Sequence, residues 1–232
     1  MLKILAITDT HGNVESAKAL VNAVAGKKYD AIIFAGDFTS FKNVQETYEE
    51  IMDILGKIGT PIYYVFGNRD RSFDSLGLGI WAEPEATRPT FLDMQREEIG
   101  EGVFITANPL LADDNTIFIS HRANQLAENA LLHLEGHIHY GIYYKNYINL
   151  GFLFRDDFHA DKEGLGCYWE ITISGKIVKS VKWKNLGIMK ELKCKVHKDF
   201  LFVVPEEFEI CPLCKGDYEW EWEIFFGGEV DL

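Results

Sequence analysis

Polar residues that can bind metal ions follow five apolar runs of the chain. They occur, in order, as Asp-x-His, Gly-Asp, Gly-Asn-x-Asp, a single His, and Gly-His-x-His. The residues are Asp9, His11, Asp37, Asn68, His121, His137 and His139. Carboxylate, amide and imidazole groups together suit divalent transition metals better than magnesium or calcium. The set is also too large for one ion, which predicts two metals that share a bridging carboxylate.

The apolar runs predict the sheet that would position these side chains. Buried strands are expected at 2–8, 30–35 and 61–66, with amphipathic helices at 14–25 and 43–55 between them. This order implies a parallel sheet with helical crossovers, and therefore an α/β fold. Ligands of such sheets bind beyond the carboxyl ends of the strands, so the polar residues should meet in one crevice.

Shorter signals predict the elements in the middle of the chain. We expect a short helix near 91–98 and another helix at 123–130. The Ser174-Gly175 pair predicts a hairpin turn. Strands are expected at 102–106, 115–119, 130–135, 141–150, 166–173 and 176–183.

The series of motifs resembles the calcineurin-like metallophosphoesterase superfamily over residues 4–139, and the strands to residue 183 fit the rest of that domain. The resemblance implies a four-layer α/β/β/α sandwich with a dinuclear centre of manganese, iron or zinc. One metal would be held by Asp9, His11, Asp37 and His139. The other would be held by Asp37, Asn68, His121 and His137, with Asp37 as the bridge.

The resemblance also implies a reaction. Two ions about 3.5–4 Å apart lower the pKa of a bridging water, and the resulting hydroxide attacks a clamped phosphoryl group in line. The segment Asn149–Phe152 stands where small phosphodiesterases of the superfamily carry Asn-Pro-Gly-Ser, which favours a phosphodiesterase. The residues expected to act in catalysis are Asp37, Asn68, Arg69 and His137.

Two arginines depart from the superfamily pattern. Arg69 stands where a histidine usually serves as general acid, and arginine does not give up a proton near neutral pH. Arg122 follows His121 at a position that is usually glycine. We expect Arg69 and Arg122 to contact the substrate. The alternative is that each is a surface arginine paired with a carboxylate, which for Arg69 would be Asp70.

Cysteines near the C-terminus predict a metal site of another kind. Cys194 and His197 are separated by two residues, and so are Cys211 and Cys214. This is the spacing of a tetrahedral structural zinc site. The alternative is that these cysteines are reduced and bind no metal. We expect a metallophosphoesterase domain over 1–187 and a module resembling a zinc ribbon over 188–232, closed by a half-buried strand at 217–226. The zinc ligands would be Cys194, His197, Cys211 and Cys214.

Composition restricts the partners and the location of the protein. The 232 residues include 23 basic and 36 acidic side chains, a net charge of −13, which makes the chain a poor general binder of nucleic acid. A lysine-rich stretch at 176–198 breaks this trend, and residues 176–214 are a candidate contact for nucleic acid or protein. No apolar run approaches the roughly 20 residues of a membrane helix, and no signal peptide is evident. We therefore expect a cytoplasmic protein with no membrane partner.

These observations favour a phosphoester hydrolase that depends on two metals and acts on a phosphodiester. The alternatives are a nuclease that acts on DNA or RNA, and a non-catalytic metal-binding scaffold. Three further residues are given structural or surface roles. We expect His133 and Cys167 to be buried and His159 to face solvent.

Overall fold

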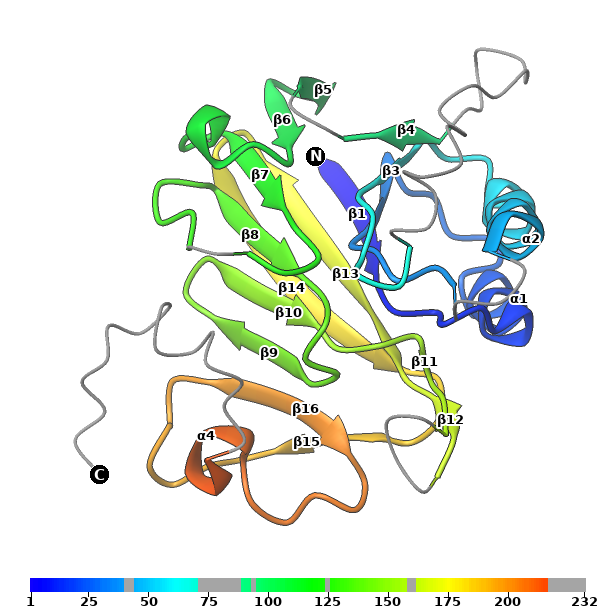
Figure 1. Ribbon diagram of the computed structural model, residues 1–232. Coiled ribbons are helices and arrows are strands. Elements are labelled where there is room, and N and C mark those ends of the chain that lie inside the picture. The colour runs from blue at the N-terminus through cyan, green and yellow to red at the C-terminus, as the bar shows by residue number, and fades with distance from the viewer. Residues whose placement is uncertain (40–43, 71–88, 93–94, 124–125, 158–161, 217–232) are drawn as a thin grey trace.

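A computed structural model describes residues 1–39, 44–70, 89–92, 95–123, 126–157 and 162–216. It contains two β-sheets that face each other, and two helices that cover the outer face of the first sheet (Figure 1). The helices are α1 (Val14–Ala23) and α2 (Val44–Gly56). Among these residues no helix has the length and apolarity that crossing a bilayer requires.

The first sheet has six strands in the order β14-β13-β1-β2-β3-β4. Its strands β1, β2, β3 and β4 are parallel, as the alternation of strands and helices predicts. β13 and β14 extend it as an antiparallel hairpin on the other side of β1. The strands are β1 (Leu2–Ile7), β2 (Ala31–Phe34), β3 (Ile62–Tyr64), β4 (Thr90–Phe91), β13 (Cys167–Ser174) and β14 (Ile177–Asn185).

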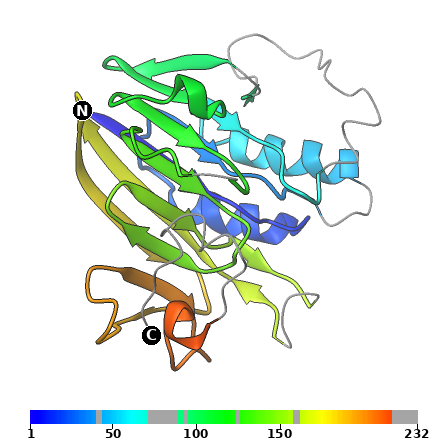
Figure 2. The ribbon, with the colours of Figure 1, turned by 60° about the vertical axis from the view of Figure 1, so that its left-hand side comes forward.

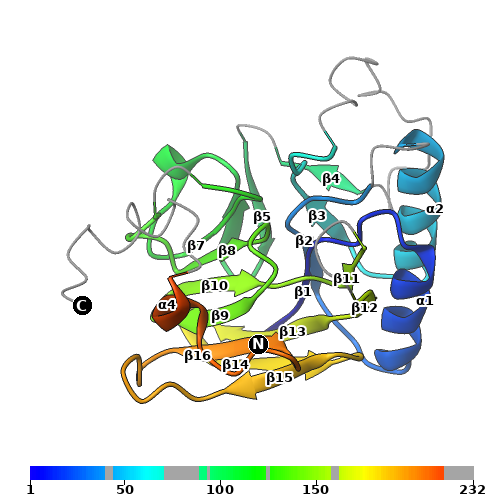
Figure 3. The ribbon, with the colours of Figure 1, turned by 60° about the horizontal axis from the view of Figure 1, so that its bottom comes forward.

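The second sheet has eight strands in the order β15-β16-β9-β10-β8-β7-β6-β5. These are β5 (Arg96–Gly100), β6 (Val103–Thr106), β7 (Thr116–Ile119), β8 (Leu132–Glu135), β9 (Gly141–Tyr144), β10 (Tyr147–Leu150), β15 (Met189–Leu192) and β16 (Leu201–Pro205). The remaining short elements are the 3-10 turn η1 (Pro109–Leu111), the paired strands β11 (Phe154–Arg155) and β12 (Gly164–Leu165), and the helix α4 (Pro212–Lys215). Figure 3 shows β7–β10 on one side of β1–β3 and the helices α1 and α2 on the other.

The alternation of side chains along β1 explains how these layers pack. Leu2, Ile4 and Ala6 belong to the core between the two sheets. Leu5 and Ile7 belong to the core between the first sheet and the helices. Successive side chains of a strand point to opposite faces, so a strand covered on both sides must be apolar throughout. The α/β sandwich of stacked sheets expected from the sequence is therefore confirmed, with α1 and α2 over the outer face of the first sheet.

Two of the predicted helices are wrong. In place of a helix near 91–98, Arg96–Gly100 forms β5 and pairs with β6, and the Arg96 guanidinium lies 4.1 Å from the centre of the Phe104 ring. The described residues of 123–130 form turns, not a helix. Its buried alanines Ala123, Ala127 and Ala130 pack as a small cluster with Phe118. Their helix-like spacing reflects this contact and not a continuous turn of helix.

The described part of the predicted C-terminal module continues the second sheet. β16 pairs with β9, and β15 forms the outer edge beside it. Figure 2 shows these two strands, in orange, next to the light-green strands of the sheet. The boundary between residues 187 and 188 stays a prediction. The strand predicted at 217–226 and the solvent position predicted for His159 lie outside the described residues.

Candidate metal centres

The residues predicted as metal ligands follow strand ends and meet at one edge of the two sheets. Five of them, Asp9, His11, Asp37, His137 and His139, have left-handed backbone conformations with φ between 47° and 75°. Only two other non-glycine residues in the described part of the chain have positive φ. Such conformations cost about 1–3 kcal/mol each and persist where the surrounding structure determines them. Their concentration here supports a functional site.

One group of ligands is centred on Asp9. Its Oδ1 atom lies 3.2 Å from His11 Nε2 and 3.1 Å from His139 Nε2. The other carboxylate oxygen accepts hydrogen bonds from the Thr8 hydroxyl and, at 3.2 Å, from the backbone N–H of His137. These contacts fix the orientation of the carboxylate, so that Oδ1 is directed at the two imidazoles.

A second group surrounds His121. Its Nε2 atom lies 3.4 Å from Asp37 Oδ2 and 3.0 Å from Asn68 Oδ1. Its Nδ1–H donates to the carbonyl oxygen of Ala35 at 2.8 Å, which leaves Nε2 as the atom that faces the group. The ring of His137 lies 5.2 Å from the ring of His121, centre to centre. All seven predicted metal ligands are thus brought into one region.

Two carboxylates lie between the groups. The ligand atoms of Asp9, His11 and His139 lie within 4.8 Å of one another, and so do those of Asp9, Asp37 and His121. Asp9 is therefore common to both groups, whereas the sequence analysis assigned the bridge to Asp37. Asp37 Oδ2 is also 3.8 Å from His11, so it too approaches both groups. The buried oxygen and nitrogen donors fit two divalent cations, and the assignment of each ligand to one ion stays a prediction.

Burial and charge have opposite effects on the ionisation of these groups. Burial alone would raise the pKa of Asp9, but His121, His11 and His139 outweigh it and hold that pKa well below its ordinary range. Burial alone would lower the pKa of His121, but the carboxylates of Asp9 and Asp37 outweigh it and raise that pKa to about 9. A proton on His121 thus balances the carboxylates, and cations that bind here must displace it.

Glycine is required beside Asp37. A Cβ atom at Gly67 would lie 2.0 Å from Asp37 Oδ1 and 2.4 Å from its backbone nitrogen. We expect Gly67→Ala to displace this carboxylate and to weaken metal binding about tenfold or more, as disturbing the support of a ligand does. Metal titration of the purified protein measures this. Gly56→Ala, where a Cβ meets nothing within 4 Å, is the matched control. Equal metal affinity in the two variants would contradict the placement of Asp37.

Arg69 is buried beside the metal ligands, and its partner is a residue that the sequence analysis missed. Its Nη1 atom donates to Asp156 Oδ2 at 2.8 Å, and its Nε atom lies 3.9 Å from Asp37 Oδ2. Asp156 Oδ2 also lies 3.8 Å from His11 Nδ1. The carboxylate of Asp70, the partner considered from sequence, accepts instead from three backbone N–H groups and the Thr39 hydroxyl.

The structure also places four other residues that the sequence analysis singled out. Arg122 is exposed, and its contact with substrate stays a prediction. His133 and Cys167 are buried, as expected. Asn149, which follows the metal ligands in sequence, donates to the carbonyl oxygen of Gly136 at 2.6 Å and so supports the loop that carries His137 and His139.

The four predicted zinc ligands converge near α4. The sulfur atoms of Cys194 and Cys214 are 3.6 Å apart, and His197 Nδ1 lies 3.5–3.6 Å from the sulfurs of all three cysteines. A tetrahedral zinc site with ordinary bond lengths has edges of about 3.5–3.8 Å. All of the cysteines are free, so no disulfide competes for these sulfurs. The donor set and its dimensions fit one zinc ion with a complete protein shell.

Of the solved structures that resemble this chain, one aligns closely enough to support the fold. One structure aligns with a TM-score of 0.56 at 12% identity, over 79% of this chain and 98% of its own. TT1561 of Thermus thermophilus aligns with a TM-score of 0.46 at 15% identity, over 80% of this chain and 99% of its own. The phosphoesterase YfcE from E. coli aligns with a TM-score of 0.45 at 16% identity, over 78% of this chain and 98% of its own.

The family itself is shown by the sequence. A search of curated proteins gave no match. The model of the calcineurin-like phosphoesterase family matches residues 2–160. This range includes all seven predicted ligands of the dinuclear centre, from Asp9 to His139. On this evidence the chain belongs to the calcineurin-like phosphoesterase family.

Proposed function

We propose that this protein is a phosphodiesterase that works with two divalent transition metals, manganese, iron or zinc. The observation that carries the proposal is the pair of ligand groups that meet at Asp9 and Asp37. When bound, the cations would supply Lewis acidity to the phosphoryl oxygens and would activate the attacking water. The residues proposed to hold them are Asp9, His11, Asp37, Asn68, His121, His137 and His139.

The chain's own residues would hold and orient this centre. The two carboxylates bring negative charge between the cations and so reduce their mutual repulsion. The imidazole of His121 is held in one tautomer by the carbonyl of Ala35. Asn68 approaches the same imidazole through its Oδ1 atom, the atom that could serve as a metal ligand. Both features favour a preformed site over one assembled by the substrate.

Arg69 is the basis for proposing a substrate with a good leaving group. The guanidinium provides a fixed positive charge next to Asp37, where a phosphoryl group would bind, but it cannot protonate a leaving group. Asp156 holds that guanidinium in place through an ion pair in which the arginine side chain is 5% exposed. A substrate whose leaving group departs without a proton therefore suits this site best.

We predict that the rate of hydrolysis rises steeply as the pKa of the leaving group falls, because no proton donor is provided at position 69. Activated aryl phosphodiesters should be hydrolysed faster than alkyl phosphomonoesters. The measurement is a series of aryl and alkyl esters assayed with added manganese, with cyclic nucleotides and single-stranded DNA in the same panel. A rate that does not depend on leaving-group pKa would contradict the proposal.

The variant Arg69→His tests the position directly. A histidine there would restore a proton donor, so substrates with poor leaving groups should gain about 10-fold or more relative to activated ones. Arg96→His, at an arginine of β5 paired with Asp113, is the matched control. If poor leaving groups gain nothing from Arg69→His, position 69 does not face the leaving group.

We also propose that Cys194, His197, Cys211 and Cys214 hold one structural zinc. Four protein ligands leave no coordination position for water, so the ion would serve folding and not catalysis. The free energy of binding such an ion adds to the folding free energy of the segment that supplies the ligands.

A further inference from the structure

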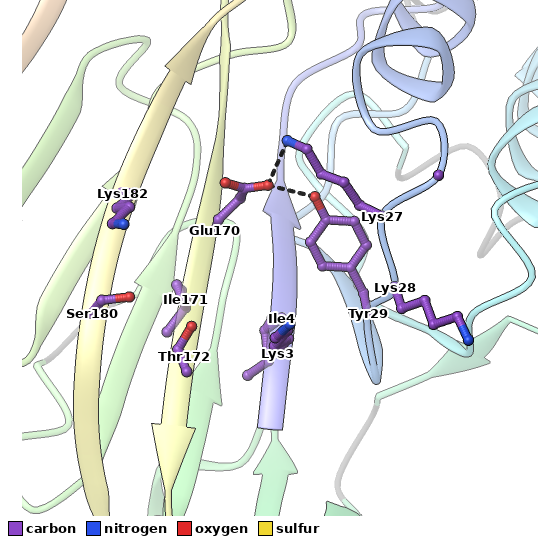
Figure 4. Close-up of a pocket in the computed structure, with 11 residues that line it drawn as sticks. Lys3, Ile4, Lys27, Lys28, Tyr29, Glu170, Ile171, Thr172, Ser180 and Lys182 are labelled. Carbon is purple, nitrogen blue, oxygen red and sulfur yellow. Dashed lines mark hydrogen bonds and ion pairs between the residues drawn. The ribbon is translucent and has the colours of Figure 1, made fainter. Parts of the chain in front are cut away.

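A groove on the outer face of the first sheet lies away from the metal centres. It has a volume of about 490 Å³ and lies between the turn that follows α1, residues 26–29, and the strands β13 and β14 (Figure 4). Lys3 on β1, which lines it, precedes Asp9 by six positions, a separation of roughly 20 Å along an extended chain. The groove is therefore a separate site.

The floor of the groove is polar and is set by the strand register. Lys3, Thr172 and Ser180 are directly opposite one another on the three adjacent strands. Glu170 and Lys182 form the next row. Directly opposite residues share a face of the sheet, so the two hydroxyls and the two ammonium groups are presented together. A rigid sheet holds them, which reduces the entropy lost when a ligand binds.

The charges that line the groove are mostly positive and mostly uncompensated. Glu170 is the carboxylate among them, and it accepts hydrogen bonds from Lys27 Nζ at 2.8 Å and from the Tyr29 hydroxyl at 2.6 Å. Lys27 and Glu170 therefore neutralise each other. Among the residues that the structure describes, the ammonium groups of Lys3, Lys28 and Lys182 have no ion-pair partner. Figure 4 shows Lys28 at the rim, with its ammonium group directed away from Glu170.

We propose that this groove binds a small anion that carries two or more phosphoryl groups. Its volume lies within the range of about 300–1,000 Å³ that is typical of small-molecule sites. Ammonium groups and hydroxyls are suitable donors to phosphoryl oxygens. A cavity of this volume can hold a small anion whole, whereas a long polyanion would have to extend beyond it. The site does not depend on the proposed catalytic function.

Protection of a sheet edge does not account for these lysines. Lysine on an edge strand discourages pairing with other chains, and β14 is an edge strand. Lys3, however, lies on the central strand β1, and Lys28 lies in the turn after α1. Two strands and the turn after α1, which differ in local context, thus contribute lysines to the lining of one cavity.

The test is calorimetric titration of the full chain with sodium pyrophosphate and with sodium tripolyphosphate. The same titrations on Asp37→Asn, in which the dinuclear centre is weakened, separate anion binding in the groove from anion binding at that centre. We expect one binding site per chain and an affinity that falls as salt is raised. Lys3→Gln and Lys182→Gln should each weaken binding about three- to tenfold, whereas Lys18→Gln, at an exposed lysine paired with Glu15, should not.

Two outcomes would overturn the proposal. One is the absence of pyrophosphate binding, or binding that is unchanged in both lysine variants. The other is binding of a single-stranded oligonucleotide that depends on Lys3 and Lys182 when pyrophosphate does not bind, which would make the groove a nucleic-acid contact. Lys3→Arg and Lys182→Arg keep the charge and should restore binding. They separate a loss of charge from a loss of folding.

Discussion

The variant Asp37→Asn is expected to lower kcat/KM for an activated aryl phosphodiester about a thousandfold, which corresponds to about 4 kcal/mol of activation free energy. The purified protein should also retain less metal. The reason is charge, because asparagine keeps the shape of the side chain but removes the negative charge between two cations. Asparagine Oδ1 can still accept the backbone N–H of Arg69, which donates to Asp37 Oδ1 at 2.8 Å. The loop itself should therefore be little disturbed.

Elemental analysis and steady-state kinetics on the same preparation provide the test. Asp53→Asn makes the same chemical change at an exposed position of α2 and should leave both quantities unchanged. Asp9→Asn identifies the shared ligand, because Asp9 belongs to both ligand groups. If Asp37→Asn keeps two tightly held metals while Asp9→Asn loses both, the bridge is Asp9. If neither variant loses metal, the dinuclear assignment is wrong.

The convergence of the predicted metal ligands could be anticipated from the sequence because two independent signals coincide. Each ligand follows an apolar run, and parallel strands bring their carboxyl ends to one edge. Some of the predicted ligands also stand close together in the chain as short motifs, such as Asp9 and His11, which are two residues apart. Which carboxylate is shared could not be found in this way. It depends on the orientation that the Thr8 hydroxyl and the N–H of His137 impose on Asp9, a three-dimensional detail.

Asp156 shows a second limit of sequence analysis. It pairs with Arg69 across 87 positions of the chain, and nothing in its immediate neighbourhood distinguishes it from the acid that follows it. The described residues of 123–130 show a third limit. Alanines at helical spacing indicate a shared packing face, but a set of turns can present the same face when the strands on either side fix its ends. The local sequence pattern identifies which residues are buried, but it does not determine whether the backbone that carries them is helical.

We expect Cys211→Ser to release the structural zinc and to expose the loops around it to protease. Cys211 is buried, and its Sγ accepts the N–H of Cys214 at 3.3 Å at the start of α4. Serine is close in size and can accept the same hydrogen bond, so the change mainly removes a metal ligand. β16 should stay in place, because it pairs with β9 of the larger body. New cleavage should therefore fall at 193–200 and 206–216.

Turnover of a small aryl phosphodiester should change less than about twofold in Cys211→Ser. The segment supplies no predicted ligand to the metal centre. Its described links to that region are the packing of Phe208 against Tyr140, whose ring centres are 5.4 Å apart, and the ion pair between Arg155 Nη1 and Glu207, whose side chain is 50% exposed. Such pairs contribute about 0–1 kcal/mol, and Arg155 is also held by the carbonyl oxygen of Lys162. Cys167→Ser, at a buried cysteine outside the cluster, should lower overall stability without losing zinc.

Zinc content, limited proteolysis and turnover are measured on both variants. A tail that stays protected after Cys211→Ser would show that zinc does not hold it. A loosened tail together with lost turnover would show that the segment forms part of the wall of the metal centre, and that its contacts with Tyr140 and Arg155 help to hold the metal ligands in place.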